Sequence, residues 1–249
     1  MYHINMSKSP SMNNIYIIIP CYNEEGNIKG VLEEIKEVSK ESSDFWQIVV
    51  VNDSSTDNTS LEASKISNTI VLNLDVNLGV GGAVQTGLIY SEKKNADYVL
   101  KVDGDGQHNP VEIINMLKPL LEDKADIVIG SRFLEKNNGF KSTLFRRFGI
   151  KMLQIVCCFL TKQSITDPTS GFRAYNSKAL HFMAENYPSF DYPEPEEVVL
   201  AAKNNLRIIE VPVVMRERRA GKSSISFYGS FYYMIKVILS MFFIKLRSK

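Results

Sequence analysis

Short apolar runs rich in β-branched residues recur along the first half of the chain, and each one ends in polar or glycine-rich residues. Such runs are typical of strands that are buried on both faces of a sheet. They predict five strands, over residues 15–19, 47–51, 69–72, 98–102 and 127–130. Helical spacing of apolar residues follows the first strand, with Asn27 as a candidate N-cap. Alternating strands and helices favour an α/β fold with a mainly parallel sheet.

Polar segments follow four of the predicted strands, at residues 20–24, 53–57, 103–108 and 131–132. In open parallel sheets, ligands bind beyond the carboxyl ends of the strands. We therefore expect these four segments to form one site. No internal repeat or low-complexity linker divides the chain, so we expect one domain with a C-terminal extension.

Two carboxylates, Asp103 and Asp105, follow the fourth predicted strand within the sequence Asp-Gly-Asp-Gly-Gln-His. Two such carboxylates can converge on one divalent cation, and the intervening glycines let the backbone fold tightly around it. Oxygen ligands suit Mg²⁺ or Mn²⁺ better than zinc. A cation with open positions would bind a nucleotide diphosphate. The alternative is a solvated Asp/Gly turn, which the position after a buried strand disfavours.

Three other polar residues at the predicted strand ends have two interpretations each. Asp53 could accept a hydrogen bond from a nucleobase N–H or a ribose hydroxyl, or it could form an Asx-turn or cap a helix. Asn23 and Glu24 could contact a nucleoside, or they could cap the first helix.

Seven short motifs occur in a fixed order along the chain. They are Ile19-Pro20-Cys21-Tyr22-Asn23-Glu24-Glu25, Val51-Asn52-Asp53-Ser54-Ser55-Thr56-Asp57, Asn77-x-Gly79-x-Gly81-Gly82-Ala83, Asp103-Gly104-Asp105-Gly106-Gln107-His108, Gly130-Ser131-Arg132, Asp167-Pro168-Thr169-Ser170-Gly171-Phe172-Arg173 and Glu210-Val211-Pro212-Val213. Together, over about residues 15–226, they resemble the family 2 glycosyltransferases of the GT-A fold. The dolichyl- and polyprenyl-phosphate mannosyl- and glucosyltransferases are the most similar subgroup.

The resemblance implies a Rossmann-like, mostly parallel sheet flanked by helices in a domain over residues 15–225. We expect a disordered tail over residues 1–14 and an amphipathic, membrane-associating segment over residues 226–249. The implied cofactor is Mg²⁺ or Mn²⁺, held by Asp103, Asp105 and Gln107. The implied catalytic residues are Asp105, Arg132 and Glu196. The implied nucleotide-sugar-binding residues are Pro20, Tyr22, Asn23, Glu24, Asp53, Gly82, Asp103, Gly104, Arg132, Arg218 and Lys222.

Three of these assignments depart from the family pattern or have alternatives. The family often has a lysine directly after Ser223, where this chain has Ser224, so Lys222 is the candidate substitute. Arg132 would face either the donor phosphates or the acceptor. Glu196 could orient the acceptor or act as a general base, or it could simply start a helix near its positive end.

Positive charge is segregated along the chain, although the net charge is only +1. Residues 136–166 contain six Lys/Arg and residues 218–249 contain seven, and neither segment contains an acid. Both segments are also apolar and aromatic, which favours a membrane surface or a lipid phosphate over nucleic acid. The apolar part of residues 227–246 is interrupted by Lys236 and Ser240, which favours a helix lying at the bilayer interface. Residues 143–160 are the second candidate for such a helix. The alternative is that both helices pack on the sheet or on a partner subunit.

We therefore expect an inverting, metal-dependent enzyme that transfers a sugar from a UDP- or GDP-sugar to a polyprenyl phosphate. The three cysteines are Cys21, Cys157 and Cys158, and their odd number and spacing favour a reduced, cytosolic protein. Together with the cationic, apolar segments, this predicts a peripheral protein at the cytoplasmic face of the membrane. A homo-oligomer or a membrane-protein partner remains open. The alternatives are a saccharide hydroxyl acceptor with Glu196 as base, a nucleotidyltransferase and a non-catalytic membrane adaptor. The acidic segment after the first strand disfavours the nucleotidyltransferase, which needs a basic loop for a triphosphate.

Overall fold

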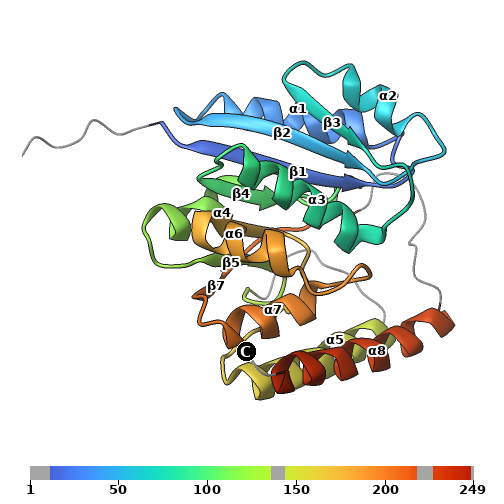
Figure 1. The fold of residues 1–249 in the computed structure, drawn as a ribbon, viewed down its shortest axis with the longest axis vertical. Helices are drawn as coiled ribbons and strands as arrows, with labels where there is room; N and C mark the ends of the chain where they lie inside the picture. The colour runs from blue at the N-terminus through green and yellow to red at the C-terminus, as the bar shows by residue number, and fades with distance from the viewer. Residues whose placement is uncertain (1–11, 136–143, 218–226, 248–249) are drawn as a thin grey trace, which may run out of the picture.

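A seven-stranded sheet forms the centre of the computed structural model, which describes residues 12–135, 144–217 and 227–247 (Figure 1). The strand order is β3-β2-β1-β4-β6-β5-β7. The strands are β1 (Asn14–Cys21), β2 (Phe45–Asn52), β3 (Thr69–Asn73), β4 (Tyr98–Lys101), β5 (Ile127–Ser131), β6 (Arg173–Asn176) and β7 (Ile208–Pro212). All pairings are parallel except those of β6, which is antiparallel to β4 and β5. The predicted α/β fold with a mainly parallel sheet is confirmed.

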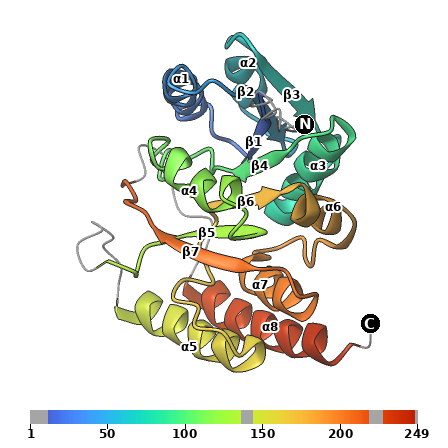
Figure 2. The same cartoon turned by 90° about the vertical axis from the view of Figure 1, so that its left-hand side faces the viewer.

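Helices cover both faces of the sheet (Figures 1 and 2). They are α1 (Ile28–Ser39), α2 (Thr59–Ser64), α3 (Gly79–Lys93), α4 (Glu112–Leu121), α5 (Leu144–Thr161), α6 (Ser177–Asn186), α7 (Glu194–Lys203) and α8 (Phe227–Leu246). Helices α1, α2 and α4 contribute to the apolar cluster on one face, and α3, α5, α6, α7 and α8 contribute to the cluster on the other. Helices α5 and α8 lie side by side beyond the β7 edge (Figure 2).

Two helix starts have features that the sequence pattern does not predict. Helix α3 begins at Gly79, so the glycines of the motif at residues 77–83 lie inside its first turn. Asn27 has the predicted N-cap position of α1, but its side-chain amide donates to Glu24 Oε2 at 2.6 Å and makes no cap hydrogen bond. The sequence pattern also gives no sign of β6, a strand of four residues that begins with an arginine.

A buried carboxylate, Asp126, connects strands β5, β6 and β7 at one side of the sheet. Its oxygens accept from the Arg207 guanidinium at 3.0 Å, from the Arg207 backbone N–H at 2.8 Å and from the Asn176 side chain at 3.0 Å, and Lys178 Nζ lies at 3.1 Å. Burial alone would raise the pKa of Asp126, but these hydrogen bonds outweigh it and hold the pKa well below its ordinary value. The ionised carboxylate therefore stabilises the junction of β5, β6 and β7.

We predict that Asp126→Asn lowers the free energy of unfolding by about 2–3 kcal/mol at pH 7, because a buried charge with several donors is lost. The depressed pKa means that the unfolded chain takes up the proton first as the pH falls. The advantage of the native residue should therefore diminish below about pH 4. Urea unfolding at pH 7 and pH 3 measures both effects.

Asp123→Asn is the matched control, because the Asp123 carboxylate also contacts Arg207 but its side chain is 86% exposed. It should cost less than about 1 kcal/mol. An Asp126→Asn effect that is the same at both pH values would contradict the assigned role of the ionised carboxylate.

Candidate functional site

The loop over residues 103–108 follows β4 at the carboxyl edge of the sheet and crosses directly above β1. A β-carbon on Gly104 would lie 2.7 Å from Cys21 Sγ, so only glycine permits this close crossing. Gly106 has a φ of 78°, a left-handed conformation that also favours glycine. The two glycines therefore turn the loop so that Asp103 and Asp105 lie at the same edge of the sheet.

The two carboxylates of this loop differ in their surroundings. Asp105 is only 5% exposed, and its Oδ1 accepts from the backbone N–H of Gln107 at 2.9 Å. Asp103 is more open, and its Oδ2 lies 3.4 Å from His108 Nε2. The backbone N–H of Asp103 donates to His108 Nδ1 at 3.0 Å. His108 therefore fixes the loop from inside.

The His108 ring is buried and stacks on Phe172 with the ring centroids 4.7 Å apart. Burial lowers the pKa of His108, so the imidazole is neutral at pH 7. Because Nδ1 accepts a hydrogen bond, the proton of this neutral ring is on Nε2, which faces Asp103. His108 thus supports the loop that carries Asp103.

Negative charge is concentrated at this edge of the sheet. The pKa of the Cys21 thiol is raised well above its ordinary value, first by burial and then by the nearby carboxylates of Glu24, Asp103 and Asp105. A divalent cation would relieve this concentration of charge, and carboxylate and amide oxygens are the ligands that Mg²⁺ and Mn²⁺ prefer. The residues present therefore fit the predicted cation.

Within the described ranges, no three His, Cys, Asp or Glu side chains gather as a metal site. A cation held by Asp103 and Asp105 could take further oxygen ligands from Gln107, water or a bound phosphate.

The segments after β1 and β2 are tied to each other. Asn23, with a φ of 56°, accepts from the backbone N–H of Thr56 at 2.8 Å, and its own N–H donates to Ser55 Oγ. The Glu24 backbone N–H donates to Thr59 Oγ1 at 2.7 Å. Pro20 is the penultimate residue of β1 and Tyr22 is half exposed beside it. The predicted nucleoside-binding segments thus lie together, and Asn23 and Glu24 also have structural roles there.

Asp53 is buried at the end of β2 and holds the start of α3. Its Oδ1 accepts from the backbone N–H of Leu78 at 2.7 Å, and Asn77 Nδ2 donates to its carbonyl at 3.0 Å. Burial raises the pKa of Asp53, and the hydrogen bonds at the start of α3 oppose this. Asp53 does not cap α2, the helix after Thr59, because the N-cap residue of that helix is Asn58. Its side chain fixes the start of α3 instead, and any contact of its second oxygen with a nucleoside would be a further use of the same side chain.

The glycines at the start of α3 allow another segment to approach. The backbone N–H of Gly81 donates to Phe190 O at 2.7 Å, and a β-carbon on Gly81 would lie 1.9 Å from Ser189 O. A β-carbon on Gly82 would lie 2.5 Å from Leu78 Cβ. The predicted nucleotide-sugar contact of Gly82 thus has a competing explanation, because close packing already requires glycine there.

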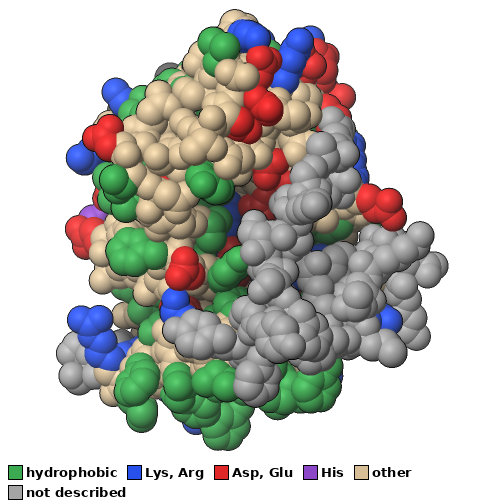
Figure 3. All heavy atoms as spheres, turned by 90° about the vertical axis from the view of Figure 1, so that its right-hand side faces the viewer, with side chains coloured by type: hydrophobic (Ala, Val, Ile, Leu, Met, Phe, Trp, Pro, Cys, Tyr) green, Lys and Arg blue, Asp and Glu red, His purple; other side chains and the backbone are tan. Residues whose placement is uncertain are grey.

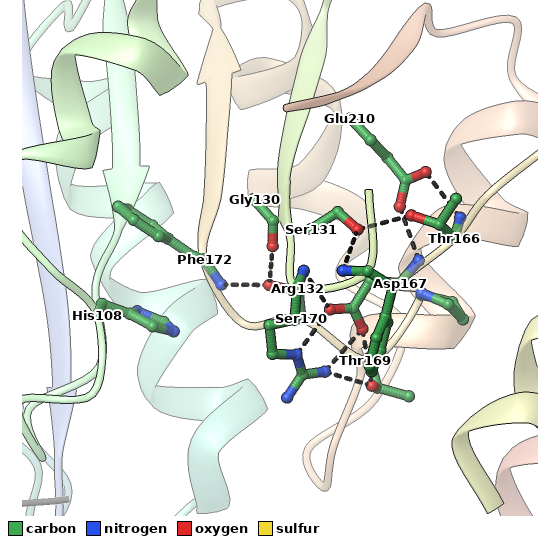
Figure 4. Close-up of polar contacts among 12 residues, drawn as sticks. His108, Gly130, Ser131, Arg132, Thr166, Asp167, Thr169, Ser170, Phe172 and Glu210 are labelled. Atoms are coloured by element: carbon green, nitrogen blue, oxygen red, sulfur yellow. Dashed lines mark hydrogen bonds and ion pairs between the residues drawn. The ribbon is translucent and has the colours of Figure 1, made fainter. Parts of the chain in front are cut away.

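Arg132 follows β5 and forms a bidentate ion pair with Asp167, with Nε and Nη2 each 2.7 Å from a carboxylate oxygen (Figure 4). Nη2 also donates to Thr169 Oγ1 at 2.7 Å. The segment that carries Asp167 is held in turn by Glu210 of β7, which accepts from the backbone N–H groups of Thr166 and Asp167. Arg132 is thus held rigidly at the carboxyl edge, by a partner that the sequence pattern does not indicate.

Glu196 lies in the first turn of α7 and is directed toward α8. It is buried, Ser240 donates a hydrogen bond to it, and the charge of Lys236 acts on it. Burial raises the pKa of Glu196 to about 7, although the Ser240 hydrogen bond and Lys236 oppose the shift. Glu194, two residues earlier, reaches the sheet instead, where its Oε1 lies 2.7 Å from Lys101 Nζ. Of these two glutamates, the one that reaches β4 is therefore Glu194, which the family pattern does not single out.

The chain after β7 runs back to the 103–108 loop. Met215 forms an isolated bridge with His108, and the backbone N–H of Arg216 donates to Gln107 O at 2.9 Å. The predicted phosphate-binding residues Arg218 and Lys222 lie outside the described residues.

Helices α5 and α8 expose a continuous apolar face at the end of the molecule (Figure 3). Neither helix contains an acid, and their exposed cations include Arg147, Lys151 and Lys245. The exposed apolar residues are Phe148, Ile155, Phe159, Ile235, Leu239, Phe242, Phe243 and Leu246. Within the described residues, none of the helices has the length and apolar character needed to cross a bilayer.

Comparison with known proteins places this geometry in a family. The model of glycosyl transferase family 2 matches residues 16–183. A UDP-N-acetylglucosamine–dolichyl-phosphate N-acetylglucosaminyltransferase of Methanococcus voltae is 33% identical over 216 residues, which cover 80% of this chain and 84% of the relative. A dolichyl-phosphate beta-glucosyltransferase of Trichomonas vaginalis is 31% identical, covering 90% of this chain and 76% of the relative.

The fold is also similar to that of a solved glycosyltransferase. Glucosyl-3-phosphoglycerate synthase from Mycobacterium tuberculosis, solved with Mn²⁺, UDP-glucose and phosphoglyceric acid, superposes with a TM-score of 0.72 at 17% identity. The match covers 95% of this chain and 81% of that one. At this identity the likeness concerns the fold, which is the GT-A fold. With its family model, its relatives and its fold in agreement, the chain belongs to glycosyl transferase family 2 and is a glycosyltransferase.

Proposed function

We propose that this glycosyltransferase moves a sugar from a nucleotide-diphosphate sugar to a polyprenyl phosphate of the dolichyl type, with inversion at the anomeric carbon. The observation that carries the donor half is the placement of Asp103 and Asp105 at the anionic edge of the sheet, beside the segments after β1 and β2. The names of the two curated relatives support the acceptor half.

Asp103, Asp105 and Gln107 would hold Mg²⁺ or Mn²⁺, which would neutralise the diphosphate as it leaves. Pro20, Tyr22, Asn23, Glu24 and Asp53 would surround the nucleoside, with Gly82 and Gly104 shaping its binding site. The Gly81 N–H in the first turn of α3 already donates to Phe190 O, so this turn would not bind the diphosphate. The diphosphate would therefore depend on the cation and on Arg218 and Lys222 for its countercharge.

The acceptor would approach from the α5–α8 face. A phosphate oxygen of the lipid attacks the anomeric carbon as the bond from that carbon to the diphosphate oxygen breaks. Arg132, held in place by Asp167, is our candidate to orient either the diphosphate of the donor or the phosphate of the lipid acceptor. A lipid phosphate is already anionic, so this reaction needs no general base.

A saccharide hydroxyl acceptor is the second candidate, and one observation favours it. Glu196 is buried with a pKa of about 7, which is suitable for a general base, and its Oε2 has no hydrogen-bond partner among the described residues. However, its contacts with Ser240 and Lys236 direct it toward α8. We therefore rank the lipid phosphate first.

We further propose that residues 15–225 form the glycosyltransferase domain and that residues 226–249 attach it to the cytoplasmic face of a membrane. Aromatic residues and cations on one exposed helix face are typical of segments that bind at the interface of anionic bilayers. The paired faces of α5 and α8 have this character.

We predict that Asp105→Asn lowers the rate of sugar transfer by at least about 10²–10³-fold, because the cation loses a ligand and the leaving group loses its countercharge. Transfer should be measured with Mn²⁺ and the nucleotide sugar that most raises the melting temperature. Removing the cation with EDTA should have the same effect. Asp75→Asn, which removes an exposed carboxylate after β3, is the control. Full turnover by Asp105→Asn, with its melting temperature unchanged, would refute the metal role.

The acceptor class can be tested at Glu196. With a short polyprenyl phosphate as acceptor, Glu196→Gln should lower kcat less than about tenfold, because no base is required. Ser240→Ala is the control for disturbed packing, since it removes the hydrogen bond to Glu196 and keeps the carboxylate. A loss of about 10³-fold or more in Glu196→Gln alone would favour a hydroxyl acceptor instead.

Membrane attachment can be tested by co-sedimentation with vesicles containing phosphatidylglycerol. Phe159 and Phe243 are 73% and 70% exposed on α5 and α8. The double variant Phe159→Ser/Phe243→Ser should bind at least about tenfold more weakly, because two large apolar side chains no longer enter the interface. Leu61→Ser/Val111→Ser removes comparably exposed residues elsewhere and should bind as the native chain does. Equal binding by both double variants would contradict the assigned face.

A further inference from the structure

Two cations lie next to each other inside the protein, beneath the 103–108 loop. Lys101 of β4 and Arg173 of β6 are direct partners in the antiparallel ladder, so their side chains project from the same face of the sheet. Lys101 is 1% exposed and Arg173 is fully buried. Like charges in this arrangement repel each other, and each needs its own counterion.

The first turn of α7 supplies both counterions. Glu194 Oε1 lies 2.7 Å from Lys101 Nζ, and Glu197 Oε1 lies 3.2 Å from Arg173 Nη1. Arg173 also donates to the Glu194 backbone carbonyl at 2.7 Å, which fixes this turn of the helix against the sheet. Both ion pairs are buried, but only the Lys101–Glu194 pair is hydrogen-bonded, and the two pairs also differ in what lies beside them.

Only the Lys101 pair adjoins the candidate metal ligands. A β-carbon on Gly171 would lie 3.3 Å from Lys101 Nζ and 3.1 Å from Asp103 Oδ2, so both groups border the same small space. The Lys101 ammonium is held at hydrogen-bond distance by Glu194, and Asp103 is the other carboxylate whose charge acts on it. Without Glu194, this buried cation would be left with Asp103 as its counterion.

We propose that Glu194 is a positioning residue, which holds the Lys101 ammonium so that this ammonium does not compete with the divalent cation for the Asp103 carboxylate. This inference rests on the proposed metal site. Without Glu194 the lysine competes with the metal for Asp103. Partners of this kind, which act through a metal ligand, commonly change metal affinity by about 10–100-fold.

The test is the binding of Mn²⁺ to the full chain in the presence of UDP, measured from the electron paramagnetic resonance signal of free Mn²⁺. Glu194→Gln should raise the Kd for Mn²⁺ by at least about tenfold. Lys101→Met/Glu194→Gln removes the competing cation together with its counterion, and it should restore the Kd to within about threefold of the native value. If the two substitutions acted independently, the double variant would instead bind Mn²⁺ no more tightly than Glu194→Gln does.

Glu197→Gln is the matched control. It breaks the neighbouring buried ion pair in the same helical turn, so its melting temperature should fall about as far as that of Glu194→Gln. Its Kd for Mn²⁺ should remain native. If Glu194 were only structural, both variants would change the melting temperature and neither would change Mn²⁺ binding selectively.

The outcomes separate the two proposals. Native Mn²⁺ affinity in Glu194→Gln, or a double variant that binds as weakly as Glu194→Gln, would overturn the positioning role and leave the metal site intact. If the native chain itself does not bind Mn²⁺ with UDP, the proposed metal site is wrong, and the role of Glu194 is wrong with it.

Discussion

The pairing of two buried cations with the first turn of α7 is the interaction on which the arrangement of this protein depends. Lys101 and Arg173 cannot share one ladder without nearby carboxylates, and α7 must therefore dock with its acidic end against β4 and β6. Helix α7 in turn packs against α5 and α8. The position of the exposed apolar face is thus set by charges that lie directly beneath the candidate metal site.

Glycine has two different roles around this site. Gly104 and Gly106 shape the loop that presents two carboxylates. Gly79 and Gly81 instead make room for the backbone of Ser189 and Phe190, and the Gly81 N–H is used by that segment. A glycine-rich helix start is often a phosphate-binding site, but here its donor is already occupied. The countercharge for a diphosphate must come from elsewhere on the same edge.

Much of the fold could be predicted because its central strands are continuous apolar runs that end in distinctive polar motifs, as β1 and β2 do. Strand β6 could not, since four residues beginning with Arg173 become a strand only through antiparallel partners distant in sequence. At the site, the position of Asp103 and Asp105 could be predicted, because both residues follow a buried strand and the carboxyl ends of parallel strands lie at one edge of the sheet. The partners of Arg132 and the distinction between Glu194 and Glu196 depend on tertiary contacts that no local pattern contains.

Helix α8 belongs to the interior as much as to the surface. Its residues Val237 and Met241 are fully buried in the cluster that also contains Val198 and Val199 of α7. The border near residue 225 that we propose between the enzyme domain and a membrane-attachment segment therefore does not coincide with a border of folding. A shortened enzyme that ends there would expose the apolar side of α7 to water, and better solubility should be sought by replacing the outward residues of α8 while keeping the helix.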